Sequence, residues 1–128
     1  MRENDVAKVI VDVCLAIHKE LGPGLLESVY AAVLADELRE CGLEVSSQVA
    51  LPVYWKDRKI DLGYRIDLLV CGVVIVEVKS VETLADVHYK QLLTYLRLAD
   101  KRLGILVNFN SALLKGQIKR IINGKIDI

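Results

Sequence analysis

The chain has few of the residues that build disulfide-stapled, zinc-binding or membrane-spanning proteins. Its 128 residues include three cysteines, Cys14, Cys41 and Cys71, and no two of them have the CxxC spacing of a redox or zinc motif. The longest apolar run, residues 68–76, is about half the length that a transmembrane helix needs. The polar start MREND lacks the basic-then-apolar pattern of a signal peptide. We therefore expect a cytoplasmic protein without a membrane partner.

Linkers and repeats are also lacking. No proline- or serine-rich stretch and no internal repeat divides the chain. Apolar residues make up 53% of the sequence, which is enough for a core. The sequence therefore predicts a single domain over residues 1–128.

The net charge of zero conceals an uneven distribution. Residues 1–50 carry 4 basic and 9 acidic residues, whereas residues 51–128 carry 13 basic and 8 acidic residues. Lys119 and Arg120 belong to a basic C-terminal part. Such a part is either a phosphate-binding surface or the solvated face of a short element, and charge alone leaves both open.

Hydrophobic spacing predicts two helices and then a sheet. Apolar residues three and four apart between Val6 and Leu21 predict a first helix, and a second is expected from Pro23 or Leu25 to Gly42. Pro52 is expected at an edge or a bulge, and Gly63 is a candidate interruption. Strands are expected at 44–55, 59–70, 73–79 and 103–109, with a helix at 85–99, and residues 118–122 fit either a short strand or a helical turn.

Two acids and a lysine stand in the central predicted hairpin. With a two-residue loop at 71–72, Asp67 would lie on the face opposite to Glu77 and Lys79. With a three-residue loop at 70–72, ending in a left-handed glycine, the three charged residues share one face. We favour the second register because it leaves a wholly apolar opposite face, formed by Ile66, Leu68, Val74, Val76 and Val78.

The favoured register sets Asp67 diagonally beside Glu77, roughly 7 to 8 Å away at the backbone, which is close enough to share a metal ion. Apolar neighbours flank both acids. A buried carboxylate is costly unless it is paired or binds a cation. An internal salt bridge to Lys79 is thus one interpretation and a metal site is the other, and the pattern alone favours the salt bridge.

Several separate motifs resemble one known family. The segment LGPGLLESVY, with Gly24, Glu27 and Tyr30, is similar to the signature of the GxxExxY family, which belongs to the PD-(D/E)XK nuclease superfamily. The resemblance runs from about Val6 to Asn123 and includes LPVYWKDRKIDLGYRIDLLV, VIVEVKSVE and QLLTYLRL. It implies an α/β, restriction-endonuclease-like PD-(D/E)XK core with a mixed central sheet flanked by helices. The order α-α-β-β-β-α-β that hydrophobic spacing predicts fits this core.

The resemblance also implies a metal-dependent phosphodiesterase site. Glu27, Asp67, Glu77 and Lys79 are the implied catalytic residues, although Ile66 stands where the family motif often has proline. Asp67, Glu77 and the backbone carbonyl of Val78 would bind Mg²⁺ or Mn²⁺, which prefer oxygen ligands. Lys79 would assist the attacking water, and Glu27 would hold a further water or a second ion.

Further candidates surround this set. Gln91 and Tyr95 match the QxxxY element of the RecB-like exonuclease branch, and His88 extends their helix face. Weaker candidates for substrate contact are Arg65, Tyr30, Lys119 and Arg120.

The expected substrate is nucleic acid, and DNA in particular. The alternative is a non-catalytic nucleic-acid-binding or protein-interaction module with the nuclease fold, against which the complete set of implied catalytic residues argues. One Trp, one Phe and five Tyr offer few platforms for base stacking, so backbone contact is favoured over base reading. A small-molecule hydrolase would need a deep pocket, which the sequence does not indicate. In so short a chain, a homodimer or a partner protein would supply specificity.

Overall fold

The structure of the protein, a computed structural model, describes residues 2–60 and 63–126. Within these ranges no helix is long and apolar enough to cross a membrane. The helices are α1 (Glu3–Leu21), α2 (Glu27–Glu40) and α3 (Asp86–Ala99). The strands are β1 (Val45–Ala50), β2 (Val53–Trp55), β3 (Arg58–Ile60), β4 (Arg65–Val70), β5 (Val74–Lys79), β6 (Leu103–Asn108) and β7 (Ile118–Ile122).

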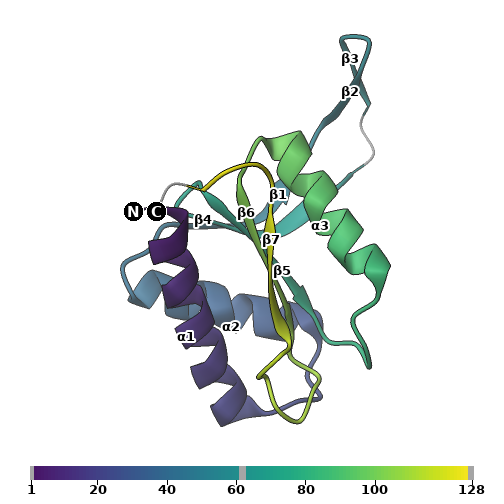
Figure 1. Cartoon of the computed structure of the whole chain (residues 1–128). Helices are drawn as coiled ribbons and strands as arrows, with labels where there is room; N and C mark the ends of the chain where they lie inside the picture. The colour runs from purple at the N-terminus through teal and green to yellow at the C-terminus, as the bar shows by residue number, and fades with distance from the viewer. Residues whose placement is uncertain (1, 61–62, 127–128) are drawn as a thin grey trace.

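A five-stranded sheet in the order β1-β4-β5-β6-β7 forms the middle layer. β5 and β6 are parallel and are connected by α3, whereas the other neighbouring pairs are antiparallel. α1 and α2 cover one face of the sheet and α3 covers the other (Figure 1). This three-layer arrangement is the mixed sheet between helices that the sequence predicts.

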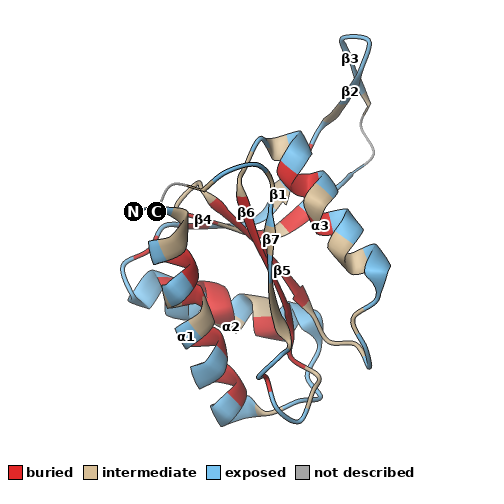
Figure 2. Ribbon diagram, viewed as in Figure 1, coloured by how far each residue is buried: buried red, intermediate tan, exposed pale blue. Residues whose placement is uncertain are grey.

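The larger part of the core lies between the sheet and the first two helices (Figure 2). Val6, Ile10, Val13 and Ile17 face it from α1, at the predicted spacing of three and four. Every residue of β6 is buried, because that strand has neighbours on both edges and helices on both faces. The strand is accordingly apolar from Leu103 to Val107.

A smaller core lies beneath α3. Leu92 and Leu96 of α3 pack there in one cluster with Leu106 of β6. Directly below the helix, β6 has Gly104, where a Cβ atom would lie 2.9 Å from Cγ of Leu92. A glycine is required here because α3 approaches the sheet too closely for a side chain.

Two predicted strands are each divided in two. The expected strand 44–55 is β1 and β2 with Pro52 between them, and the expected strand 59–70 is β3 and β4, with Gly63 at φ +70° before β4. Proline cannot donate a ladder hydrogen bond, so the pairing ends there. β2 and β3 consequently leave the main sheet and form a two-stranded sheet of their own.

Two further boundaries are decided by the structure. Residues 118–122, which fit a strand or a helical turn, form β7 beside β6. α2 begins at Glu27, later than the expected start at Pro23 or Leu25. The reason is Gly24, whose φ of +106° does not occur in a right-handed helix.

We expect Gly104→Ala to destabilise the fold, because the added methyl group would overlap Leu92. Overpacking of this kind costs about 1 to 3 kcal/mol in the free energy of unfolding. Urea denaturation would measure it. In a Leu92→Val background the cost of Gly104→Ala should shrink, since the smaller side chain makes room. An equal cost in both backgrounds would contradict the proposed overlap.

Candidate active site

The hairpin formed by β4 and β5 carries the two acids. Its loop is Cys71–Val73, because Val70 pairs with Val74. The predicted loop length of three residues is confirmed, but the loop lies one residue later than predicted. The predicted register with a loop at 70–72 and the observed register with a loop at 71–73 set the same residues on the same face of the hairpin. Continued past the last paired residues, the observed register sets Asp67 directly opposite Glu77 rather than diagonal to it.

Asp67 stands at a break in the pairing of β4. The β1–β4 ladder skips the pair that Asp67 would make with Gln48, whose φ is +52°. The β4–β5 ladder ends one residue away, at Leu68. Beyond that end, Asp67 Oδ2 accepts a 2.8 Å hydrogen bond from the backbone N–H of Val78. A carboxylate thus joins the two strands where regular main-chain pairing stops.

The same break changes the surroundings of Ile66. The prediction that Ile66 shares an apolar face with Leu68 is wrong, because Ile66 packs with Leu51 and Tyr95 beneath α3. Leu68 packs beneath α1 and α2, where the predicted Val74, Val76 and Val78 also lie. Strict alternation along β4 therefore fails at the residue between Ile66 and Leu68, which is Asp67.

Glu77 is the buried acid of the pair. The residue is 4% exposed, and its Oε1 is the buried side-chain polar atom without a hydrogen bond in the described part of the chain. Burial raises the pKa of Glu77 to about 9, and hydrogen bonding with Asp67 and the charge of Asp67 act in the same direction, against the opposing charge of Lys79. Without a cation, its surroundings therefore favour the protonated form of Glu77.

Lys79 follows Glu77 by two residues, so strand alternation sets both on one side of β5. Lys79 forms no ion pair with Asp67 or Glu77. The ion pair that the described residues form joins Arg102 to Asp100. The internal salt bridge that the sequence pattern favours is therefore not observed. The ammonium group remains partly exposed beside the acids.

Glu27 reaches the end of β5 from the first turn of α2. Its Oε2 accepts a 3.0 Å hydrogen bond from the backbone N–H of Ser80, and Ser80 Oγ donates to the carbonyl of Leu25 at 2.8 Å. The structure thus brings Glu27 to the residue that follows Lys79. Sequence reasoning missed Ser80, for which a hydroxyl directly after the Glu-x-Lys triplet was the available signal.

Asn108 is a second residue that sequence reasoning missed. It is fully buried at the end of β6, where Oδ1 accepts from the N–H of Val81 at 3.0 Å and Nδ2 donates to the carbonyl of Val81 at 2.9 Å. Its signal was a lone polar residue in an otherwise apolar strand. Asn108 fixes the chain just beyond Ser80.

Tyr95 brings α3 to the acids. The residue is buried, and its pKa is raised by burial first and then by the charges of Glu77, Tyr64 and Asp67. The ring of Tyr64 lies 6.1 Å from the ring of Tyr95, centroid to centroid. Both tyrosines and Gln91 line one groove along α3, so the predicted Gln91–Tyr95 pair does share a surface.

Two other predicted residues have structural partners. His88 Nδ1 accepts a 3.0 Å hydrogen bond from the N–H of Ala85 at the start of α3. Tyr30 is fully buried, its ring is stacked 4.4 Å from that of Phe109, and its hydroxyl donates to the carbonyl of Gly22. A substrate cannot reach such a ring, so the structure contradicts the predicted substrate contact at Tyr30.

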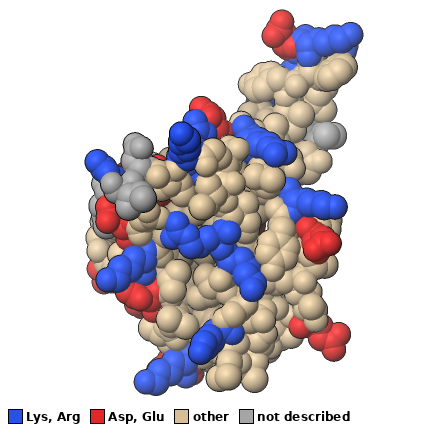
Figure 3. All heavy atoms as spheres, in the orientation of Figure 1, with Lys and Arg blue, Asp and Glu red and all other residues tan. Residues whose placement is uncertain are grey.

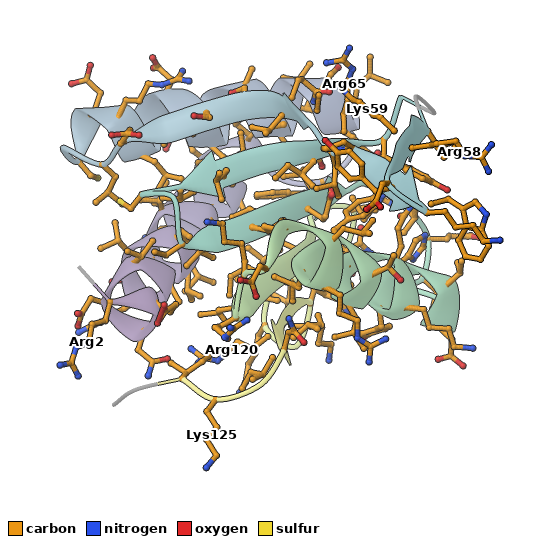
Figure 4. All side chains as sticks on the ribbon, turned by 90° about the horizontal axis from the view of Figure 1, so that it is seen from above. Arg2, Arg58, Lys59, Arg65, Arg120 and Lys125 are labelled. Atoms are coloured by element: carbon orange, nitrogen blue, oxygen red, sulfur yellow. The ribbon has the colours of Figure 1, made fainter. Side chains whose placement is uncertain are left out.

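The predicted basic contacts fall on two sides of the molecule (Figure 4). Arg65 begins β4, the strand of Asp67, and its Nη1 donates to the carbonyl of Gln48 at 3.4 Å. Lys119 and Arg120 belong to β7, which β6 separates from β5. Arg120 donates a 2.6 Å hydrogen bond to Asn4 of α1. The structure therefore leaves Arg65 near the acids and does not gather Lys119 and Arg120 with them.

A family model described as the PD-(D/E)XK nuclease superfamily matches residues 4–121. The chain belongs to this superfamily. The match confirms the predicted superfamily and, with the observed sheet, its restriction-endonuclease-like fold. No curated protein and no solved structure matches the chain. The narrower GxxExxY family stays a prediction.

Proteins of the PD-(D/E)XK superfamily are generally nucleases and usually use divalent metals, so this is a nuclease-type domain. Its described residues contain no group of three His, Cys, Asp or Glu side chains able to hold an ion. Two carboxylates and main-chain carbonyls remain as donors, and this oxygen set suits Mg²⁺, which keeps several waters. The unpartnered Oε1 of Glu77 fits a cation at this point.

In divalent-free buffer, we expect stability to fall as pH rises through the window between the two pKa values of Glu77. The unfolded chain releases the proton near 4.5, whereas the folded protein keeps it until about 9. The free energy of unfolding therefore decreases with pH between these values, by at most about 1.4 kcal/mol per pH unit from this group. Urea denaturation at several pH values measures the slope.

Glu77→Gln should remove that part of the slope, since an amide does not titrate. The exposed Glu82→Gln serves as the matched control and should keep the slope of the wild type. Equal slopes in the wild type and Glu77→Gln would show that Glu77 titrates normally.

Proposed function

We propose that this domain is a divalent-metal-dependent nuclease that hydrolyses phosphodiester bonds in DNA. The observation that carries the proposal is the carboxylate of Glu77, buried beside Asp67 with one oxygen unpartnered. The ionised form of such a group is costly unless a positive charge compensates it, and Lys79 forms no ion pair with it. A divalent cation shared by Asp67 and Glu77 would supply the missing partner.

Asp67, Glu77 and the backbone carbonyl of Val78 are the proposed ligands of Mg²⁺ or Mn²⁺. When bound, such an ion polarises the scissile phosphate and lowers the pKa of a water. The chain holds its ligands in advance, because the hydrogen bond from the N–H of Val78 keeps the carboxylate of Asp67 against β5. Pre-organisation of this kind reduces the reorganisation that the reaction needs.

Lys79 is the proposed partner of the attacking water. Its ammonium group can orient that water and offset the negative charge that develops on the phosphate. Glu27 acts beside it, because its hydrogen bond to Ser80 fixes the main chain next to Lys79. The exposed carboxylate of Glu27 can also accept a hydrogen bond from water in the site.

DNA is the proposed substrate within the nucleic acids that the superfamily implies. Arg58, Lys59 and Arg65 gather on one side of the molecule (Figure 4), and Arg65 belongs to the strand of Asp67. Phosphate backbones are held by such side chains. Residues 1–128 are proposed to act as one domain, with a second copy or a partner protein adding specificity.

The test is cleavage of labelled single-stranded and duplex DNA, with RNA for comparison, in Mg²⁺ or Mn²⁺. We expect metal-dependent cutting of DNA by the wild type. Asp67→Asn and Lys79→Met should each slow it by about 100-fold or more, the size of effect typical for lost acid–base or electrostatic assistance. Calorimetric titration with Mn²⁺ should show weakened binding in Asp67→Asn and near-normal binding in Lys79→Met.

Exposed residues of like charge provide the matched controls. Glu40→Gln at the end of α2 and Lys19→Met on α1 should cut at the wild-type rate. Cutting that survives in both site variants would point to a contaminating enzyme or another site. A wild type that binds Mn²⁺ but cuts none of the substrates would favour a non-catalytic module instead.

A further inference from the structure

The β2–β3 hairpin projects beyond the rest of the molecule (Figure 1). Its two strands pair with each other and with no other strand of the described chain. A lone two-stranded hairpin is only marginally stable in water. The β2–β3 hairpin therefore contributes little to the stability of the core. Contact with another molecule is a better explanation for such an element than a role in folding.

Each face of this hairpin carries one aromatic ring beside one cation. The register pairs Tyr54 with Lys59 and Trp55 with Arg58, so the two pairs lie on opposite faces. Lys56, in the turn, has its Nζ 5.6 Å from the centre of the Trp55 ring. The hairpin therefore combines two rings with several positive charges, and Figure 3 shows blue spheres beside one red group at its tip.

The rings are exposed to solvent. Tyr54 is 62% exposed and Trp55 is 59% exposed, and Tyr64 beyond β3 is 41% exposed. The sequence has few aromatic residues, and the three that the structure exposes all lie in or next to the hairpin. The predicted shortage of stacking platforms is thus a property of the whole chain and not of this segment.

A groove leads from the base of the hairpin along α3. Val53 of β2 and Tyr64 line the same groove as Gln91 and Tyr95 of α3. Tyr95 packs in one cluster with Ile66, the residue before Asp67. A chain held by the hairpin can therefore run along α3 toward the site.

We propose that the β2–β3 hairpin binds unpaired nucleobases, which stack on Trp55 and Tyr54 while Arg58 and Lys59 contact the adjoining phosphates. The inference rests on the proposed nuclease function and deepens it, because it assigns a single-stranded stretch to the substrate. Exposed rings need a flat partner, and the cation paired with each ring needs an anion. A single strand offers both partners, because each nucleotide carries an unpaired base and a phosphate.

The test uses equilibrium binding in EDTA, where cleavage does not interfere. Trp55 is the one tryptophan of the chain, so its fluorescence reports contact directly. We expect a single-stranded DNA or RNA oligonucleotide to quench it saturably, and a blunt duplex to bind more weakly. In anisotropy titrations, Trp55→Ala and Tyr54→Ala should each weaken single-strand binding by about 5- to 100-fold, the loss expected for one stacked base.

Trp55→Phe keeps a stacking ring and should restore most of the affinity, which separates the ring's role from any effect on hairpin structure. Arg58→Ala should reduce the slope of log K against log [salt] by about 0.7, the value for one phosphate contact to a single strand. Leu15→Ala and Lys8→Ala replace exposed residues on α1 and should bind within about twofold of the wild type.

Several outcomes would overturn the inference. One is equal affinity in the wild type, Trp55→Ala and Tyr54→Ala. Another is a blue shift of Trp55 with anionic lipid vesicles but no response to oligonucleotides, which would assign the hairpin to a membrane. If the wild type cuts DNA but substitutions in the hairpin leave the affinity for single strands unchanged, only this inference fails. If hairpin-dependent binding occurs without cutting, only the nuclease proposal fails.

Discussion

A buried carboxylate in the central strand is the constraint that organises this molecule. Glu77 lies in β5, between strands on both edges and helices on both faces, and one of its oxygens has no partner. Burying it lowers stability at any pH where it would be charged, unless a cation lies beside it. The fold carries this cost at one point, opposite Asp67, and the other buried residues of β5 are Val74, Ile75, Val76 and Val78.

The chain after Glu77 is held by side chains from three separate elements. Backbone N–H groups at positions 78, 80 and 81 donate to Asp67 of β4, Glu27 of α2 and Asn108 of β6, respectively. Each bond replaces a main-chain acceptor that regular pairing does not provide at this sheet edge. Lys79 stands in the middle of this braced segment, so its position is set by all three elements. Substituting any one of them would therefore act on Lys79 through the backbone.

Periodicity predicted the elements well where packing follows the sequence locally, as in α1, the helix at 85–99 and the apolar strand at 103–109. It failed at Ile66, because the face of that residue depends on breaks in two ladders that local sequence does not encode. Motif resemblance selected Asp67, Glu77 and Lys79 as candidates, but not their neighbours Ser80 and Asn108. Those two act through backbone groups, and such contacts appear only once distant segments are folded together.

Net neutrality of the chain does not oppose a polyanionic partner. Charges on a protein surface act over about 8 to 10 Å at physiological ionic strength, so the local balance decides binding. Residues 53–65 carry four basic side chains against two acidic ones, Asp57 and Asp61. Pro52 precedes β2 and Gly63 follows β3, so the same breaks that divide two predicted strands also separate the basic, aromatic β2–β3 hairpin from the main sheet.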